Sequence, residues 1–145
     1  MLTAVSEGFL GTGGTSGPLF GMWFRELARA AAGGLTTGAL AAGATAGLAT
    51  VQRLGRADVG DKTMVDAMVP AATALAGATG QPVSGALAAA AAAADAGASS
   101  TRDLVARRGR ASYVGQHAVG VEDPGARTVA LFFAAGANTF AGTRT

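Results

Sequence analysis

The chain has 145 residues, about a quarter of them alanine, with 23 glycines and no cysteine; half of it is hydrophobic and 6% is aromatic. A disulfide scaffold and a cysteine-ligated metal site are excluded, and the scarcity of β-branched and aromatic residues argues against a β-sandwich. With 14% charged residues and a net charge of +2, the chain is too apolar for intrinsic disorder and too weakly basic to indicate a nucleic-acid partner. We therefore expect one all-α domain over residues 1–145.

Apolar spacing and capping residues divide this domain into a series of helices. The first covers 1–10, and a second begins with Pro18 as its first helical residue and stops at Gly33-Gly34. Thr36 or Thr37 caps a third helix, which runs to about residue 53. A capping box at Thr63–Asp66 opens the next helix, which contains Pro70 and ends at a break over 80–82. An alanine-rich helix over 82–96 follows, and then a short helix over 103–108 that is capped by Ser99, Ser100 or Thr101. A long polar connection over 109–125 leads to a last helix over about 127–137.

Two long uncharged stretches lie between these breaks, one from Arg29 to Arg53 and one from Asp66 to Asp95. Each exceeds the ~20 residues that span a bilayer. They consist mostly of alanine, glycine and threonine, with few residues that favour transfer into lipid. A membrane-helix protein is therefore the weakest hypothesis, and close helix packing in an up-down bundle explains the same small residues.

Polar and glycine residues concentrate in four loops, 11–17, 55–63, 109–115 and 123–125. In an up-down bundle alternate loops lie at the same end, so we expect these loops to converge on one ligand. The loop over 11–17 leads into a helix start, where glycines and unpaired amides favour an anion such as phosphate. It lacks the Lys-Ser/Thr pair of a Walker A loop. The alternative is a plain turn before a proline-started helix.

The charged residues of these loops each allow two interpretations. Arg102, Arg107, Arg108 and Arg110 form either a solvated helix end or an anion site. Lys62, the single lysine, lies beside Asp61 either as a salt-linked helix cap or as a ligand contact. Asp123-Pro124-Gly125 has the chemistry of a tight turn. With one histidine and no cysteine, we expect no zinc site.

Together these segments resemble the L subunit of dihydroxyacetone (glycerone) kinase, the nucleotide-binding part of that enzyme. The resemblance rests on Gly-Gly-Thr-Ser-Gly-Pro-Leu-Phe-Gly (13–21), Gly-Asp-Lys-Thr-Met (60–64), Gly-Arg-Ala-Ser-Tyr (109–113) and Asp-Pro-Gly-Ala (123–126). It implies an up-down barrel of eight antiparallel helices that holds ADP or ATP with Mg²⁺ at one end. The residues that it implies at the nucleotide are Thr15 and Ser16 for the phosphates, Gly55 and Met64 by the adenine, and Arg110, Asp123, Pro124 and Gly125 to complete the site.

The chain departs from that family in one respect. The family's acidic segment, Gly-Asp-x-Asp-His-Gly, supplies the magnesium ligands and precedes the glycine-rich loop, and no stretch of this sequence matches it. We therefore expect an incomplete barrel with no metal ligands and no catalytic residue of its own, weak Mg-ADP binding, impaired phosphoryl transfer and lower stability.

The resemblance also implies partners. They are a K subunit that holds dihydroxyacetone, a phosphotransferase-system donor subunit in one version of the enzyme, and a second copy of the chain in a homodimer. We expect a cytoplasmic location. The alternative function is a non-catalytic module that binds the K subunit or a transcriptional regulator.

Overall fold

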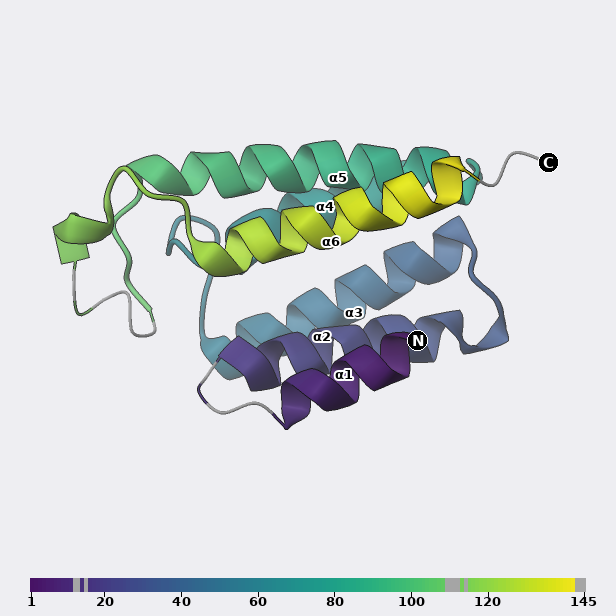
Figure 1. The fold of residues 1–145 in the computed structure, drawn as a ribbon, viewed down its shortest axis with the longest axis horizontal. Helices are drawn as coiled ribbons and strands as arrows, with labels where there is room; N and C mark the ends of the chain where they lie inside the picture. The colour runs from purple at the N-terminus through teal and green to yellow at the C-terminus, as the bar shows by residue number, and fades with distance from the viewer. Residues whose placement is uncertain (12–13, 15, 109–112, 114, 143–145) are drawn as a thin grey trace.

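The part of the chain that the structure describes, residues 1–11, 14, 16–108, 113 and 115–142 of a computed structural model, contains six α-helices and no strand. The helices are α1 (Leu2–Leu10), α2 (Ser16–Ala30), α3 (Thr37–Gly55), α4 (Val65–Gly77), α5 (Val83–Ser100) and α6 (Pro124–Ala141). Short 3₁₀ turns lie at η1 (Ala31–Gly33), η2 (Thr101–Asp103) and η4 (Gly115–Ala118). Successive helices run in opposite directions, with α1–α3 on one side and α4–α6 on the other (Figure 1). The predicted all-α, up-down architecture is confirmed.

The two sides of the bundle meet through aromatic side chains. Trp23 and Phe24 of α2 pack against Phe132 and Phe133 of α6, with ring centroids 4.9 Å apart for Phe24–Phe132 and 5.7 Å apart for Trp23–Phe133. Trp23 and Phe133 are almost completely buried. Aromatic pairs at these separations stabilise a core beyond their buried area alone, so this contact joins the first half of the chain to the second.

Elsewhere the helices approach closely because the contact residues are small. A methyl group at Gly43 of α3 would lie 2.9 Å from the Cα atom of Leu27, and one at Gly47 would lie 2.5 Å from Cδ1 of Trp23. The small-residue spacing of the sequence therefore serves packing of α3 on α2. Among the described residues, none of the helices combines the length and the apolar character that crossing a membrane requires.

Most predicted element boundaries hold to within a few residues. Thr36 is the cap of α3, because its hydroxyl accepts the N–H of Ala39 at 3.0 Å. The prediction for α2 was off by two residues, since the helix begins at Ser16 rather than at Pro18. Proline is tolerated anywhere in a first turn, where the amides have no intrahelical partner. The alanine-rich helix continues to Ser100 instead of ending near Ala96.

The predicted short helix over 103–108 is wrong. The hydroxyl of Thr101 donates to the carbonyl of Ala98 at 2.6 Å and does not cap a new helix. The η2 turn ends at Asp103, and Leu104 is extended, with φ −91° and ψ 150°. The amide of Arg107 then donates to the carbonyl of Asp61 at 3.2 Å. This segment is therefore held by the loop between α3 and α4 rather than by its own helix.

Candidate functional site

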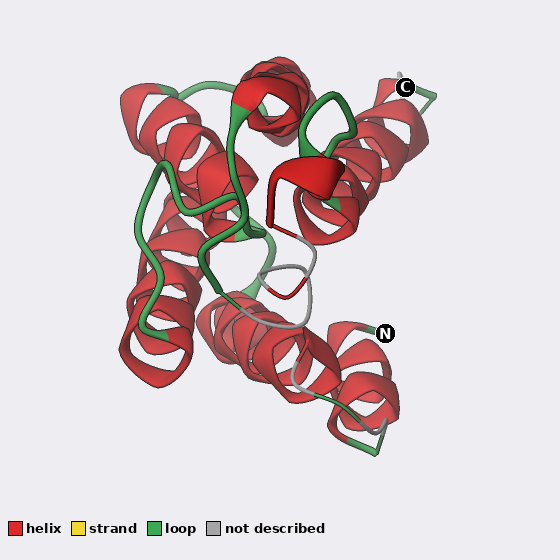
Figure 2. Ribbon diagram, turned by 90° about the vertical axis from the view of Figure 1, so that its left-hand side faces the viewer, coloured by secondary structure: helices red, strands yellow, loops and turns green. Residues whose placement is uncertain are grey.

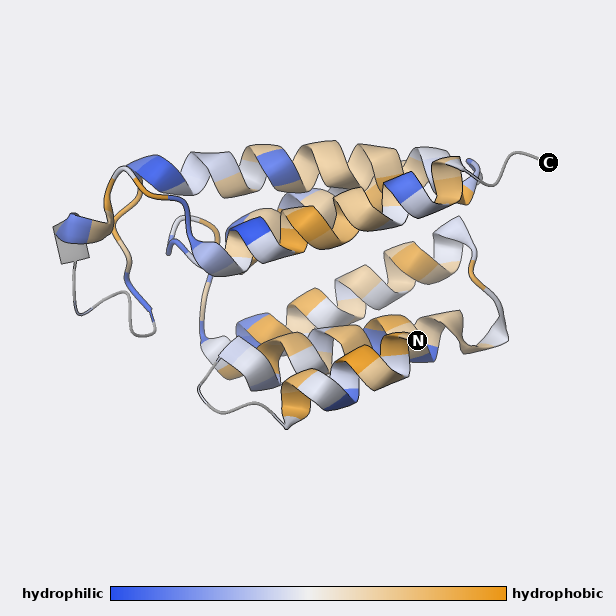
Figure 3. Ribbon diagram, in the orientation of Figure 1, coloured by the Kyte–Doolittle hydropathy of each residue, from blue (hydrophilic) through white to orange (hydrophobic). Residues whose placement is uncertain are grey.

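One end of the bundle gathers the segments that the sequence singled out. α1, α3 and α5 end there and α2, α4 and α6 begin there, at the left of Figure 1 and facing the viewer in Figure 2. The α2–α3 and α4–α5 connections lie at the opposite end. We call the end where α2, α4 and α6 begin the loop end. Hydrophilic residues lie at the adjoining ends of α5 and α6, and they alternate with hydrophobic ones in the loops of this end (Figure 3).

The start of α2 is fixed against α1 at the loop end. The buried hydroxyl of Ser6 donates to the carbonyl of Gly21 at 2.7 Å, and Leu10 packs directly over Gly21. Ser16, the first residue of α2, is exposed. Its hydroxyl and the first-turn amides of a 15-residue helix form an environment that favours an anion. Thr15, predicted beside Ser16, lies outside the described residues.

The loop between α3 and α4 is organised by one buried carboxylate. Asp66 of α4 accepts the N–H of Gly60 at 2.7 Å and the N–H of Thr63 at 2.9 Å, one on each oxygen. The hydroxyl of Thr63 accepts the N–H of Val65 at 3.1 Å. The capping box predicted at Thr63–Asp66 is present in part: Asp66 reaches back to the N–H of Thr63, but the Thr63 hydroxyl accepts from Val65 rather than from Asp66, and α4 begins after Met64. It fixes the path of the loop into α4.

Met64, the residue that directly precedes α4, lies against the first turn of α6. A methyl group at Gly125 would lie 3.3 Å from Cβ of Met64 and 3.0 Å from a carboxylate oxygen of Asp123. The backbones of two predicted ligand-contact segments therefore touch, although they are about 60 residues apart in sequence. Met64 is itself buried, whereas Pro124 is exposed.

The interpretation of Asp123-Pro124-Gly125 as a tight turn is wrong, because these residues begin α6. Asp123 is the helix cap, its carboxylate accepting the N–H of Ala126 at 2.8 Å, and Pro124 is the first helical residue. An acidic cap followed by proline is a favoured helix start. Burial raises the pKa of the Asp123 carboxyl, opposed by its bond from Ala126 and by the charge of Lys62, while the charge of Asp66 raises it further.

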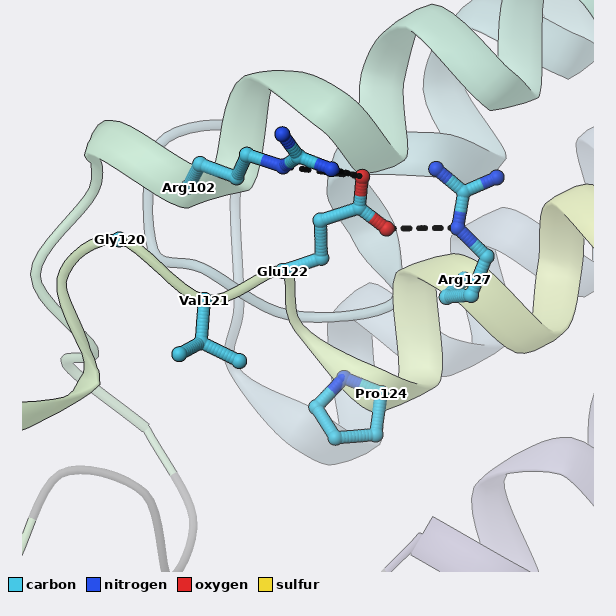
Figure 4. Close-up of a pocket in the computed structure, with 6 residues that line it drawn as sticks. All are labelled: Arg102, Gly120, Val121, Glu122, Pro124 and Arg127. Carbon is cyan, nitrogen blue, oxygen red and sulfur yellow. Dashed lines mark hydrogen bonds and ion pairs between the residues drawn. The ribbon is translucent and has the colours of Figure 1, made fainter.

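Beside this cap, Glu122 bridges two arginines on the outer side of α5 and α6 (Figure 4). One oxygen pairs with Arg102 at 3.1 Å and the other with Arg127 at 2.6 Å, and Arg127 also pairs with Asp95 at 2.5 Å. The Arg127 hydrogen bond lowers the pKa of Glu122, and Glu122 in turn raises that of Arg127. An open hollow of about 370 Å³ adjoins the bridge. Its lining residues are Arg102, Gly120, Val121, Glu122, Pro124 and Arg127.

The structure gives partners to several of the remaining charged residues. Arg102 and Arg108 pair with Glu122 and Asp61, the latter at 3.5 Å, so acidic side chains engage two of the four arginines of the predicted cluster. The salt-linked cap expected for Lys62 and Asp61 is not formed. Lys62 is buried and donates instead to the carbonyl oxygens of Thr101 and Val121. Arg110 lies outside the described residues.

All nine acidic residues lie in the described part of the chain, yet they form no group of three or more possible metal ligands there. Both oxygens of Asp66 hold backbone amides, and one oxygen of Asp123 holds the cap. Asp61 accepts the N–H of Asp58 at 3.0 Å and pairs with Arg108. Mg²⁺ prefers free carboxylate oxygens in octahedral geometry, so these residues do not fit a magnesium site.

Of the eight residues predicted at a ligand, the six described ones lie at the loop end: Ser16, Gly55, Met64, Asp123, Pro124 and Gly125. Gly55 is the last residue of α3, and a methyl group there would lie 3.4 Å from Cδ1 of Leu19 of α2. Thr101 was predicted only as a candidate helix cap, and no role was predicted for Glu122. The one sequence signal for Glu122 is that this acidic residue directly precedes the 123–126 motif. Its partners Arg102 and Arg127 lie 20 and 5 residues away in the sequence.

Comparisons with known proteins agree with these motifs. A family model described as DAK2 domain matches residues 1–138. The chain is 43% identical over 121 residues to the PEP-dependent dihydroxyacetone kinase, ADP-binding subunit DhaL, of Escherichia coli (strain K12), covering 81% of this chain and 58% of that protein. It is also 43% identical over 130 residues to L-erythrulose 1-kinase of Mycolicibacterium smegmatis, covering 85% of this chain and 22% of that protein.

A solved structure supports the same likeness. The crystal structure of the dihydroxyacetone kinase from C. freundii in complex with AMP-PNP and Mg²⁺ matches with a TM-score of 0.66 and 34% identity, covering 95% of this chain and 22% of that one. The chain thus spans little more than half of the first of these relatives and about a fifth of the other two.

Proposed function

Because the chain belongs to the DAK2 domain family, we propose that it is a nucleotide-binding component of a dihydroxyacetone-kinase-type phosphotransferase, with ADP or ATP held at the loop end. The observation that carries this proposal is the meeting of three helix starts with the family motifs. α2 begins within 13–21, α4 directly follows 60–64, and α6 begins within 123–126. Three helix N-termini at one end supply partial positive charge for a polyphosphate, although the first amides of α4 and α6 are already bonded to Thr63, Met64 and Asp123.

For the phosphates, we propose that the exposed Ser16 hydroxyl and the first-turn amides of α2 are the donors, together with Thr15 and Arg110. Backbone amides at a helix start bind phosphate oxygens without needing a counter-charge from a side chain. The Arg110 guanidinium would add a bidentate partner for the same oxygens. The phosphate end of the nucleotide would then lie over α2.

For the adenine, we propose the part of the surface of the loop end to which Gly55, Met64 and the exposed Pro124 belong. Met64 is 5% exposed, so its contribution is mainly to shape the floor of this surface through its contact with Gly125. Asp123 acts indirectly, because its carboxylate holds α6 in place instead of facing the ligand. A flat apolar base fits such a surface better than a charged group does.

Bound magnesium would neutralise charge on the phosphates, but the carboxylates of this chain do not fit it. We assign no step of phosphoryl transfer to these residues. The partners that we propose are a K subunit that holds dihydroxyacetone, a phosphotransferase-system donor subunit that rephosphorylates bound ADP, and a second copy of the chain in a homodimer. We also propose a cytoplasmic location, because the chain belongs to the same family as these kinase subunits.

The engagement of Asp61, Asp66 and Asp123 in structural hydrogen bonds favours a second candidate function. A chain that binds ADP without metal ligands suits a non-catalytic module that docks on a K subunit or a regulator in its nucleotide-bound form. Pull-down of a K subunit with and without ADP, followed by a phosphoryl-transfer assay on the captured pair, separates the candidates. Capture with transfer supports the kinase component, and capture without transfer supports the module.

The direct test is calorimetric titration of ADP into the chain, with and without Mg²⁺. We expect weak binding that Mg²⁺ does not strengthen, because the loop-end carboxylates Asp61, Asp66 and Asp123 are engaged in structural bonds. Arg110→Ala should weaken binding far more than Arg53→Ala, a matched change on the exposed side of α3. Equal effects of the two changes, or tight binding that depends on Mg²⁺, would contradict the proposed site.

A further inference from the structure

Lys62 is the single lysine of the chain, and it is only 3% exposed. Lysine is almost never buried without partners, because removing an ammonium group from water is costly. It also has φ +60°, a left-handed conformation that is costly for a residue with a side chain. A buried cation on strained backbone persists only where the surroundings over-determine it. The loop is therefore built to direct this side chain inward.

The surroundings that fix Lys62 come from the residues on either side of it. Gly60 takes φ +98°, and its N–H is held by Asp66 at 2.7 Å. The N–H of Thr63 is held by the same carboxylate at 2.9 Å. These two bonds clamp the loop before and after Lys62, so its backbone cannot relax without losing the cap of α4.

The ammonium group of Lys62 joins two distant segments. It donates to the carbonyl oxygen of Thr101 at 2.5 Å and to that of Val121, which are 39 and 59 residues away. The hydroxyl of Thr101 accepts the N–H of Asp123 at 2.8 Å. One side chain thus connects the start of α4, the end of α5 and the residues that lead into α6.

The same connection fixes the contact between Met64 and Gly125. Met64 is two residues after Lys62, and Gly125 is four residues after Val121. The tether at Lys62 joins the segments that lead into α4 and α6, and the approach of Gly125 to Met64 leaves no room for a methyl group without adjustment. If α6 moved relative to α4, Met64 and Gly125 would separate, and both belong to the proposed nucleotide surface.

We propose that Lys62 is a positioning residue of the nucleotide site, whose buried ammonium group holds the Asp123–Gly125 start of α6 against Met64. The inference rests on the proposed function for its ligand, but the tether itself is a property of the chain alone. Lys62 does not contact the nucleotide; it acts through the two carbonyl groups and through Thr101.

The test compares Lys62→Met with Thr37→Val. Thr37 is buried at the opposite end, where its hydroxyl donates to the carbonyl of Gln81 at 2.6 Å. Both variants remove a donor from a carbonyl, so both lose stability. Because small misplacements in a binding site are costly, we expect Lys62→Met to weaken ADP binding by about tenfold. Thr37→Val should stay within about twofold of the unmodified chain, and Lys62→Arg should recover part of the loss.

A second readout does not depend on the nucleotide. Hydrogen exchange of the Asp123 amide should be faster in Lys62→Met than in Thr37→Val at equal global stability, since only the first loosens the Thr101 acceptor. Lys62→Gln, which keeps one donor group, replaces Lys62→Met if that variant does not fold. Unchanged ADP affinity together with unchanged Asp123 exchange overturns the proposal. If the unmodified chain binds no ADP, the proposed function fails, and Asp123 exchange alone then decides the tether.

Discussion

The packing of α5 on α4 depends on Gly97, so replacing it with alanine should destabilise the chain. A methyl group there would overlap the carbonyl oxygen of Asp66 and would lie 2.9 Å from Cγ of Pro70 and 3.0 Å from Cα of Ala67. Ordinary contact begins near 3.4 Å. Two of these atoms belong to the backbone of α4 and cannot rotate away, so the two helices must separate.

Two opposing effects set the size of the change. Alanine is favoured over glycine inside a helix by about 1 kcal/mol. Inserting a methyl group into a tightly packed contact costs typically ~1–3 kcal/mol, with more expected when backbone must move. We therefore expect a net loss of roughly 1–2 kcal/mol in the free energy of unfolding, with packing outweighing propensity. Because Asp66 caps the loop that carries Lys62, the same change should loosen the loop end.

Gly136→Ala is the matched control. Gly136 lies inside α6, and a methyl group there would meet Leu87 side-chain carbons at 3.6 Å, an ordinary contact. This variant should gain up to about 1 kcal/mol. Urea unfolding followed by the fluorescence of Trp23, the single tryptophan, measures both. If Gly97→Ala were stabilised as much as Gly136→Ala, the close approach of α4 and α5 would be refuted.

Three further changes test other contacts. Asp123→Ala should lose the α6 cap and about 1 kcal/mol of stability, whereas Asp123→Asn should keep most of it; equal losses in thermal unfolding would argue against the cap. Because its arginine partners lower the pKa of Glu122, its contribution to stability is present above the ordinary glutamate pKa and is lost as the pH falls through the lowered value. Glu122→Gln should therefore flatten the acid side of the curve of unfolding free energy against pH, and an unchanged slope would contradict the bridge. Ser6→Ala should cost about 1 kcal/mol by removing the buried bond to Gly21, and chemical denaturation that detects no loss would count against that contact.

The sequence predicted the architecture because helix starts and stops are local signals. Thr36, the Thr63–Asp66 capping box and the glycine break at 33–34 all mark boundaries that the structure has. The convergence of alternate loops at one end follows from the up-down order alone. These features need no knowledge of which residues meet across the bundle.

The errors arose where contacts between distant segments decide local structure. Thr101 looks like a helix cap, but Lys62 and Asp123 take its carbonyl and hydroxyl groups, and the chain stays extended beyond Asp103. Gly97 looks like a helix stop, yet it continues α5 because its missing side chain admits α4. Lys62 has an acidic neighbour in sequence, but its two partners lie 39 and 59 residues away.

The central claim, that the loop end binds ADP, is tested most directly by following the backbone amide NMR signals of the chain during an ADP titration, which detects weak binding as well as tight binding. Binding at the loop end should give saturable shifts at Ser16, Met64 and Gly125, with none at Gly34 or Ala78 at the opposite end. Shifts confined to the Gly34 end, or no shifts at any ADP concentration, would contradict it.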